Sequence, residues 1–214
     1  MNAKVKAVVS GFMLLALAAC GVTPEQTVQA HLEEAVNLEE TFVKQQEPII
    51  AAEEAERERF EEMIELGLSE MDEIETLAEE AAAFVDEREE RMDTERESLT
   101  QAYNEVGEGA VYVQEIDDEK IQAMAAAVIG VMEQRYEAHG ALYEAYMDGV
   151  QLDRELYEML MDEDLAYEDL EAHVDAINDT YETVGHHKET FNEFTSTFNK
   201  KKEEFYQTAG LVEE

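Results

Sequence analysis

MIELGLSEMDEIETL, residues 63–77, is the stretch of this chain that decides its fold. Gly67 can adopt the left-handed conformation that ends a helix, and Leu68 can then fold back onto it. Ser69 can cap a new helix, with Asp72 three residues later. These signals predict that the chain reverses here. The apolar period nevertheless continues through the stretch, so a single kinked helix is the alternative.

Apolar residues recur at steps of three and four residues on both sides of this stretch, which is the period of a helix with one buried face. The stripes run through four segments: Val28, Leu32, Ala35, Leu38 and Phe42; Met71, Ile74, Ala78, Ala81 and Val85; Met124, Val128, Met132, Tyr136 and His139; and Val174, Ile177, Tyr181, Val184 and Phe191. The run at 111–113, Val-Tyr-Val, favours a β-strand but is too short to form one. Helices therefore account for the whole pattern.

The ends of the four segments carry helix-start signals of unequal strength. Thr23 and Gln26 flank a proline and form a capping-box pattern. Asp117-Asp118 precedes the third segment, and Asp164 is a candidate cap for the fourth. Pro48 lies inside the first segment, where its missing N–H predicts a kink.

The fold expected from these segments is all-α. Each segment has roughly 42 to 48 residues, which is about 65 to 70 Å of helix. Equal lengths and short turns favour an elongated up-and-down bundle of about four long antiparallel helices with coiled-coil-like packing. Residues 24–214 then form a single domain. The alternative is a long kinked first helix followed by a three-helix bundle.

The N-terminus has the layout of a secretory signal. Lys4 and Lys6 are followed by an apolar run that is shorter than the roughly 20 residues needed to span a membrane. The run ends in Leu-Ala-Ala-Cys at 17–20, which resembles a bacterial lipobox, and Cys20 is the single cysteine of the chain. We therefore expect a lipoprotein signal peptide at 1–19, a lipidated tether at 20–23 and a diacylglyceryl group on Cys20, with a plain secretory signal as the alternative. Two acyl chains anchor a protein stably, so the chain is expected at the outer face of the cell membrane.

The composition limits the partners of this protein. It has 15 basic and 54 acidic residues and a net charge of −39. Because Lys4 and Lys6 are the charged residues of positions 1–19, residues 20–214 carry 41 excess negative charges. Such a surface repels nucleic acid and anionic headgroups. The 45% hydrophobic content, regularly spaced, favours a folded chain over a disordered one.

The sequence carries no motif of a known catalytic or cofactor site. It lacks HExxH, GxSxG, a glycine-rich phosphate loop and the Glu-x-x-His pairs of carboxylate-bridged metal centres. We therefore expect a protein that is not an enzyme and that has no cofactor and no dedicated metal site, although its carboxylate runs can bind Ca²⁺ or Mg²⁺ loosely. If a ligand groove exists, its first candidate residues are Tyr136, His139, Tyr143 and Tyr146. The alternative is that this cluster is core, with His139 a hydrogen-bonded core histidine.

Most of the chain resembles the YkyA-type cell-wall-binding lipoproteins of Gram-positive bacteria. The stretches that carry this resemblance are HLEEAVNLEETFVKQQEPI (31–49), MIELGLSEMDEIETL (63–77), FVDERE (84–89), RYEAHGALYEAY (135–146), RELYEML (154–160) and EEFYQTAGL (203–211). The resemblance implies a helical bundle and a surface lipoprotein, with no catalytic residues. The family is rich in lysine on its exposed faces and this chain is acidic, which argues against charge-driven binding to anionic wall polymers.

The function expected from the sequence is that of a non-catalytic module at the cell envelope, which binds or spaces a component there. Peptidoglycan or a wall polymer is one candidate ligand, in line with the family resemblance. The alternatives are a partner-binding or assembly factor for a membrane protein complex and, with less support, an enzyme that modifies the cell wall.

Replacement of Cys20 tests the expected anchor. The variant Cys20→Ser has no thiol to accept a diacylglyceryl group, so it should lose metabolic lipid labelling and either leave the membrane fraction or remain uncut. Cell fractionation and the mass of the chain measure both outcomes. A Cys20→Ser protein of mature size that stays with the membrane would show that Cys20 is not the anchor.

Overall fold

The computed structural model describes residues 21–66, 70–162 and 164–212, and this part of the chain is helical with no β-strand. Its elements are α1 (Pro24–Leu38), α2 (Glu40–Glu65), α3 (Met71–Ala110), the short 3₁₀ helix η2 (Val111–Glu115), α4 (Glu119–Leu160) and α5 (Tyr167–Ala209). The expected all-α fold is therefore confirmed. In the described residues no helix is both long and apolar enough to cross a membrane.

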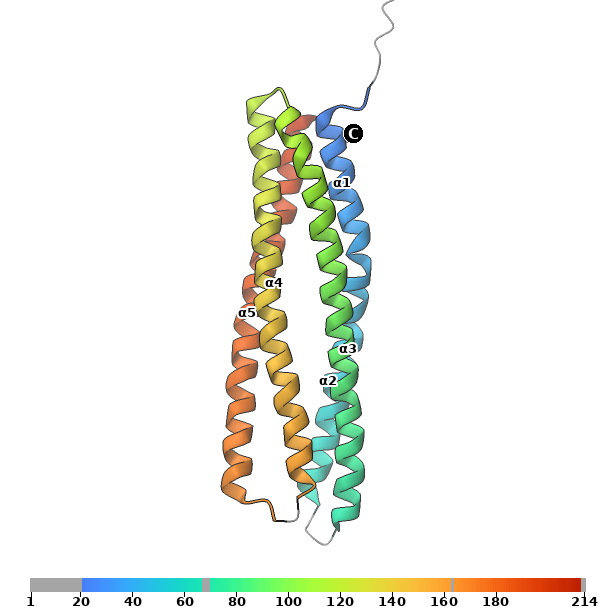
Figure 1. The fold of residues 1–214 in the computed structure, drawn as a ribbon, viewed down its shortest axis with the longest axis vertical. Coiled ribbons are helices and arrows are strands. Elements are labelled where there is room, and N and C mark those ends of the chain that lie inside the picture. Colours follow the sequence, from blue (N-terminus) through green and yellow to red (C-terminus); the bar gives the residue numbers. More distant parts are fainter. Residues whose placement is uncertain (1–20, 67–69, 163, 213–214) are drawn as a thin grey trace, which may run out of the picture.

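The helices form an elongated bundle in which the chain runs up and down its long axis (Figure 1). α1 and α2 follow one another as one long segment, and α3 returns beside both of them. An ion pair between Arg59 on α2 and Glu80 on α3, with 2.7 Å between Nε and Oε2, joins the two helices on either side of this reversal. The prediction of a reversal after residue 66 is thus confirmed, and the kinked-helix alternative is wrong. The proposed cap Ser69 lies outside the described residues, as do the predicted signal peptide at 1–19 and Cys20.

Two of the predicted helix starts are present and one is wrong. The Thr23 hydroxyl accepts from the backbone N–H of Gln26 at 3.3 Å, and the Thr23 N–H donates to the Gln26 side chain at 3.0 Å, which is a complete capping box. Asp118 caps α4, because its carboxylate accepts hydrogen bonds from the backbone N–H groups of Lys120 and Ile121. Asp164 does not cap α5, because the N-cap position is Ala166, which follows a turn closed between Leu165 and Asp162.

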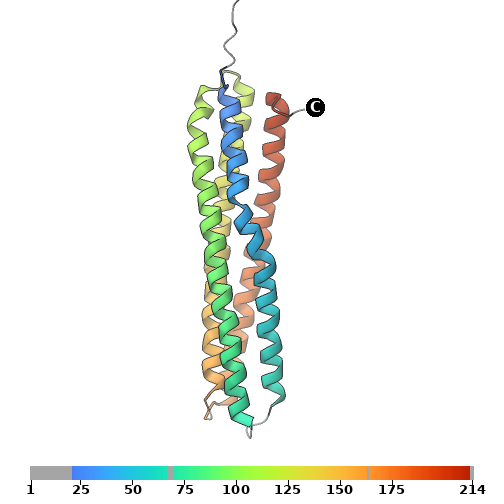
Figure 2. The same ribbon diagram turned by 90° about the vertical axis from the view of Figure 1, so that its right-hand side faces the viewer.

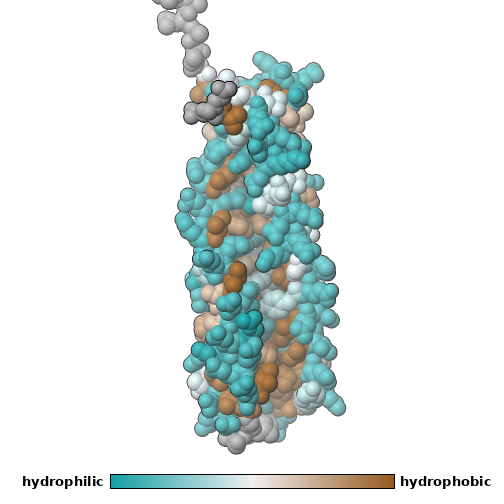
Figure 3. Space-filling view, turned by 180° about the vertical axis from the view of Figure 1, so that it is seen from behind, coloured by the Kyte–Doolittle hydropathy of each residue, from teal (hydrophilic) through white to brown (hydrophobic). Residues whose placement is uncertain are grey.

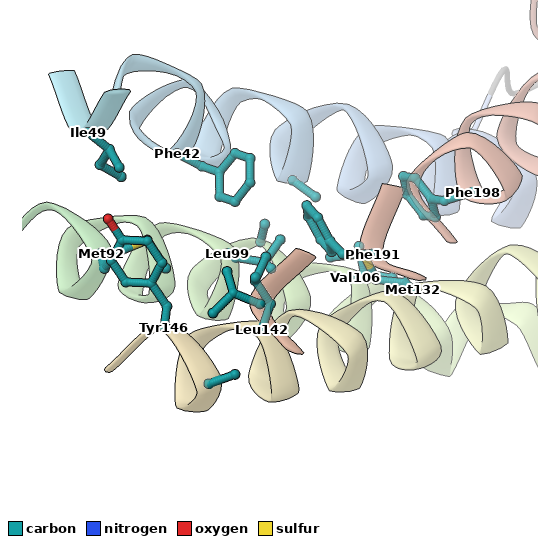
Figure 4. Close-up of a cluster of buried hydrophobic side chains, with 14 of the residues drawn as sticks. Phe42, Ile49, Met92, Leu99, Val106, Met132, Leu142, Tyr146, Phe191 and Phe198 are labelled. Carbon is teal, nitrogen blue, oxygen red and sulfur yellow. The ribbon is translucent and has the colours of Figure 1, made fainter. Parts of the chain in front are cut away.

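A continuous apolar core runs along the bundle axis (Figure 4). Its fully buried members include Leu32, Val85, Leu99, Val128, Met132 and Phe205. Full burial of one such side chain contributes about 1.5–3 kcal/mol relative to exposure. Phe42 and Phe191 meet in the middle of the bundle, with 5.7 Å between their ring centroids. The predicted stripes therefore face this core.

The first helical segment is interrupted at Glu39, between α1 and α2, and not at Pro48, which lies inside α2. The Ser98 hydroxyl of α3 enters the helix there: it donates to the Leu38 carbonyl at 2.6 Å and accepts from the Phe42 N–H at 3.0 Å. These two backbone groups are i and i+4 partners, so the hydroxyl takes the place of one helical hydrogen bond. A side chain inserted into the ladder is an established cause of kinks, and the bend between α1 and α2 is visible in Figure 2.

Removal of this hydroxyl should destabilise the bundle. Ser98→Ala leaves the partly buried Leu38 carbonyl and the buried Phe42 N–H without their partner, which costs roughly 1–3 kcal/mol. Chemical unfolding followed by circular dichroism measures this loss. The matched control Ser196→Ala, at an exposed position of α5, should change stability by less than about 0.5 kcal/mol. Equal stability of Ser98→Ala and wild type would mean that α1 and α2 can close into one regular helix, and that Ser98 does not cause the kink.

Candidate functional site

Two layers of buried polar side chains cross the bundle, and each contains residues from all of its long segments. The first, called here the Glu39 layer, consists of Glu39, Ser98, Arg135 and Thr195. The Arg135 guanidinium, with 3% of its side chain exposed, binds both carboxylate oxygens of Glu39 at 2.5 and 2.8 Å. Its Nε donates to the Thr195 hydroxyl at 2.9 Å. This bidentate geometry fixes α4 against the α1–α2 kink and against α5.

The second, called here the Arg88 layer, consists of Glu56, Arg88, Asp153, Tyr157 and Tyr181. Arg88 Nη2 lies 2.6 Å from Asp153 Oδ2, and Nη1 donates to the Tyr181 hydroxyl at 2.9 Å. The Tyr181 hydroxyl donates in turn to Asp153, and the Tyr157 hydroxyl donates to Glu56 at 2.9 Å. The side chains of Arg88, Glu56 and Asp153 are each no more than 8% exposed. One cation thus lies between two buried carboxyl groups.

Within the Arg88 layer, Glu56 is a carboxyl group whose pKa is raised. Burial raises the pKa of Glu56 from 4.5 to about 7, against the opposing attraction of Arg88. Glu56 Oε2 and Arg88 Nε are 3.0 Å apart, yet in the described residues both atoms lack a well-aligned hydrogen bond. The contact between these two atoms is therefore electrostatic only, and such an attraction does not fully offset the hydration that both groups lose on burial. Glu56 can accordingly take up a proton near neutral pH without leaving the core.

A cleft opens on one side of the bundle between these two layers. Close backbone contacts join α2 to α3, α3 to α4 and α4 to α5, whereas α5 has few with α1 or α2. The cleft has a volume of about 220 Å³ and lies between α2 and α5, with α3 and α4 as its floor. Figure 3 shows patches of apolar surface along this face, among hydrophilic residues. The apolar residues that line it are Phe42, Ile49, Ile50, Met92, Leu142, Tyr146, Val184 and Phe191.

A buried hydrogen-bonded histidine lies beneath the cleft. His139 is fully buried, its Nδ1 is 3.3 Å from Arg96 Nη1, and its Nε2 is 3.1 Å from Glu95 Oε1. Arginine only donates, so Nδ1 accepts and Nε2 carries the proton that is donated to Glu95. Glu95 also accepts from Gln46 at 3.0 Å. This chain of bonds connects α4, α3 and α2 directly beneath the cleft.

The four aromatic and histidine residues expected to line a groove fall into two rows. Tyr146 lines the cleft, and its hydroxyl donates to Glu53 at 2.9 Å, while His139 lies beneath Phe42 and Phe191. Tyr136 and Tyr143 face α3 instead. Tyr136 and Tyr143 are seven residues apart and share one face of α4, as do His139 and Tyr146. A step of three residues rotates the position by about 60° around the helix, so the two pairs point in different directions.

Tyr136 and Tyr143 have structural partners at the α3–α4 seam. Tyr136 stacks on Tyr103 at 4.2 Å between centroids and carries the Arg96 guanidinium 4.1 Å above its ring. Tyr143 donates to Asp93, and this bond raises the pKa of Tyr143 to about 12. The structure therefore brings one of the four candidate residues into the cleft, places one beneath it and places two elsewhere.

Sequence inspection missed the residues of the polar layers, although a signal for them exists. Arg88 and Glu95 fall at core positions of the stripe that runs from Val85 through Met92 to Leu99. A charged residue at such a position is rarely buried unless it is paired. Two charges of opposite sign inside one apolar stripe thus predict buried partners on neighbouring helices. Which partners they are depends on the register of the bundle, which the local sequence does not give.

The described residues form an elongated all-α bundle with an apolar cleft on one side. The chain belongs to the YkyA family: the family model described as “Putative cell-wall binding lipoprotein” matches residues 23–208. It is 30% identical over 199 residues to “Uncharacterized lipoprotein YkyA” of Bacillus subtilis (strain 168), covering 92% of this chain and 89% of that protein. This membership confirms the resemblance noted in the sequence.

A crystal structure of a conserved protein of unknown function from Staphylococcus aureus has a similar fold. The TM-score is 0.73 at 13% sequence identity, covering 85% of this chain and 93% of that one. The likeness at so low an identity extends to the fold alone.

The raised pKa of Glu56 predicts how stability changes with pH. The folded state binds a proton more tightly than the unfolded state, so the stabilisation from this proton is present below about pH 4.5 and is lost as the pH rises through 7. Glu56→Gln cannot titrate. Its stability relative to wild type should therefore increase between pH 5 and pH 8, by on the order of 3 kcal/mol for a shift of this size.

Urea unfolding of both proteins at each pH measures this difference. The control is Glu58→Gln, at an exposed position of the same helix. Its free energy of unfolding should change with pH in the same way as that of wild type. Parallel curves for Glu56→Gln and wild type would mean that Glu56 is ionised in the folded protein throughout.

Proposed function

We propose that this protein is a lipid-anchored, non-catalytic binding module at the outer face of the cell membrane, and that the α2–α5 cleft binds a component of the cell wall. Membership of a lipoprotein family supports the envelope location. The lipobox-like Leu-Ala-Ala-Cys at 17–20 supports Cys20 as the anchor. The tether of 20–23 then holds the bundle close to the membrane by the end at which α1 begins.

The cleft is the observation that carries this proposal. It is an apolar hollow on a rod whose surface is otherwise densely charged, and Ile50 on its rim is 49% exposed. Convergence of a few polar groups on an apolar pocket is typical of ligand sites. Here the polar groups are Gln46, Glu53, Lys188 and Asn192 along the walls, with Glu95 and Arg135 deeper. A ligand of this cleft would have an apolar part that enters it and polar groups that meet its rim.

The charge of the protein narrows the class of wall component. Residues 20–214 carry 41 excess negative charges, so long anionic wall polymers are repelled. The glycan and peptide parts of peptidoglycan are better candidates, since they offer methyl groups and sugar faces together with amide and hydroxyl groups. Lys188 is exposed at the rim of the cleft, and its ammonium group would pair with a single carboxylate of such a ligand.

A helix of a membrane protein is the second candidate occupant. The cleft runs lengthwise between α2 and α5, and further apolar patches lie along the same face (Figure 3). An amphipathic helix binds such a groove by inserting apolar side chains at i, i+3 and i+4. A protein helix bound in the cleft would indicate an assembly role at the membrane instead of wall binding.

Two isoleucines of α2 provide a matched test of the cleft. Ile50 lines it, and Ile64 is 65% exposed outside it. Ile50→Arg places a large charged side chain at an apolar site and should reduce the binding of the protein, residues 21–214, to purified peptidoglycan stripped of anionic polymers by at least about tenfold, because a ligand would have to desolvate that charge to enter. Ile64→Arg should bind as wild type does. Co-sedimentation measures both.

Photo-crosslinking in intact cells separates the two candidate occupants. A crosslinking amino acid at position 50 should yield wall fragments, and the same residue at position 64 should not. A membrane protein captured at position 50 alone would replace wall binding with the assembly role. Equal sedimentation of Ile50→Arg, Ile64→Arg and wild type would exclude the cleft as the site of wall binding.

A further inference from the structure

A histidine and two glutamates meet at the end of the bundle where α1 begins. We propose that His31 of α1 and Glu105 and Glu108 of α3 form a binding site for a divalent transition-metal ion, with Zn²⁺ as the best-fitting ion. One ligand atom from each residue lies within 4.8 Å of those of the other two. The site is separate from the cleft, and the inference does not depend on the proposed function.

The positions of the three side chains follow from the helices that carry them. Glu105 and Glu108 are three residues apart on α3, so their carboxylates share one face of that helix. His31 approaches from α1, and its Nδ1 lies 2.7 Å from Glu105 Oε1. His31 and Glu105 are partly buried, with side chains 21% and 23% exposed, whereas Glu108 is exposed to solvent. An ion can therefore enter from the Glu108 side.

Two contacts hold the imidazole in place without any ion. The ring of Tyr112 on η2 stacks against it at 5.8 Å between centroids and 20° between planes. Gly109 faces it from α3: a Cβ at this position would lie 2.7 Å from the Cβ of His31, so a larger residue would push α1 away. The glycine thus permits the close approach of α1 and α3 that brings His31 to the two carboxylates.

The donor set favours zinc over the abundant alkaline-earth ions. Zn²⁺ binds histidine nitrogen and carboxylate oxygen at about 2.0–2.2 Å, whereas Ca²⁺ and Mg²⁺ prefer oxygen donors alone. Ligand atoms around one tetrahedral zinc lie about 3.4 Å apart at these bond lengths. The exposed Glu108 can close the remaining distance by a change of rotamer. Three protein ligands leave the fourth position to water.

Metal binding would replace the hydrogen bond between His31 and Glu105. The imidazole must present the lone pair of Nδ1 to the ion, so the neutral ring carries its one proton on Nε2 instead of sharing it with Glu105 Oε1. The bound ion would then link α1 to α3 near the N-terminal end of the bundle. The plain alternative is that His31 and Glu105 form only a structural pair, in which case Glu108 has no part in it.

Sequence patterns do not reveal this site, because His31 and Glu105 are 74 residues apart. A search for Glu-x-x-His or His-Glu-x-x-His covers ligands on one helix only. The sequence-based expectation of no dedicated metal site rested on such local patterns.

Isothermal titration with ZnCl₂ tests the proposal. The protein, residues 21–214 without an affinity tag, is titrated in millimolar MgCl₂ so that loose binding to surface carboxylates is saturated. We expect one zinc ion per wild-type chain. Glu108→Gln should weaken binding by at least about tenfold, since the loss of even an outer-shell partner costs that much. His31→Gln should abolish it.

Metal-free melting curves distinguish a ligand from a structural residue. Glu108→Gln leaves the His31–Glu105 pair intact, so its melting temperature without zinc should equal that of wild type, while the rise caused by zinc should be lost. Two matched controls should bind zinc as wild type does: His186→Gln, whose Nε2 lies 3.9 Å from the Glu182 carboxylate on an exposed face, and Glu97→Gln, at an exposed position of α3. Absence of stoichiometric zinc binding by wild type, or unchanged binding by Glu108→Gln, would overturn the proposal.

Discussion

Arginine side chains hold together a bundle in which acidic residues outnumber basic ones by 54 to 15. Every arginine from Arg59 onwards contacts a polar group on another helix. The contacts are Arg59 with Glu80, Arg88 with Glu56, Asp153 and Tyr181, Arg91 with Gln45, Arg96 with the carbonyl of Tyr136, Arg135 with Glu39 and Thr195, and Arg154 with Asp86 and Glu89. The guanidinium group suits this role, because its planar fork binds several acceptors at once and remains charged when buried. Helices with so many carboxylates would otherwise repel one another along their length.

The two buried arginines also fix the register of the helices. Arg135 and Arg88 are each surrounded by partners from other helices, and a slide of one turn would leave a buried charge without its partner. Such a loss costs several kcal/mol, whereas an apolar stripe alone can slide by a heptad at smaller cost. The Arg88 layer is the less balanced of the two, because its single cation faces both Glu56 and Asp153. Burial is the main cause of the raised pKa of Glu56, and the negative charge of Asp153 raises it further.

Local features of the fold could be predicted from the sequence, and features made by distant residues could not. The helical stripes, the capping box at Thr23 and the cap at Asp118 depend on residues within a few positions of each other, and all three are present. The kink was expected at Pro48, but it lies at Glu39 because Ser98, far along the chain, inserts its hydroxyl there. The four candidate groove residues are divided between two places for the same reason: the repeat in 135–146 gives two rows of side chains, and only the packing decides which row meets the cleft.

The cleft is a consequence of where the polar layers lie. On α2 it spans residues 42–53, between Glu39 and Glu56, and on α5 it spans 184–195, between Tyr181 and Thr195. The layers are about 25 Å apart along α2, at 1.5 Å per residue. In both layers a hydrogen bond joins α5 to α4: Arg135 donates to Thr195 in one layer, and Tyr181 donates to Asp153 in the other. These bonds hold α5 on the α4 side of the bundle. No comparable hydrogen bond among the described residues joins α5 to α2 between the layers, so the cleft stays open there, with Phe42, Ile49 and Phe191 buried in its walls and Ile50 exposed at its rim. The same buried charges that set the register therefore keep an apolar cleft open on an acidic rod, and a ligand that fills the cleft would gain its affinity from contact with these apolar walls.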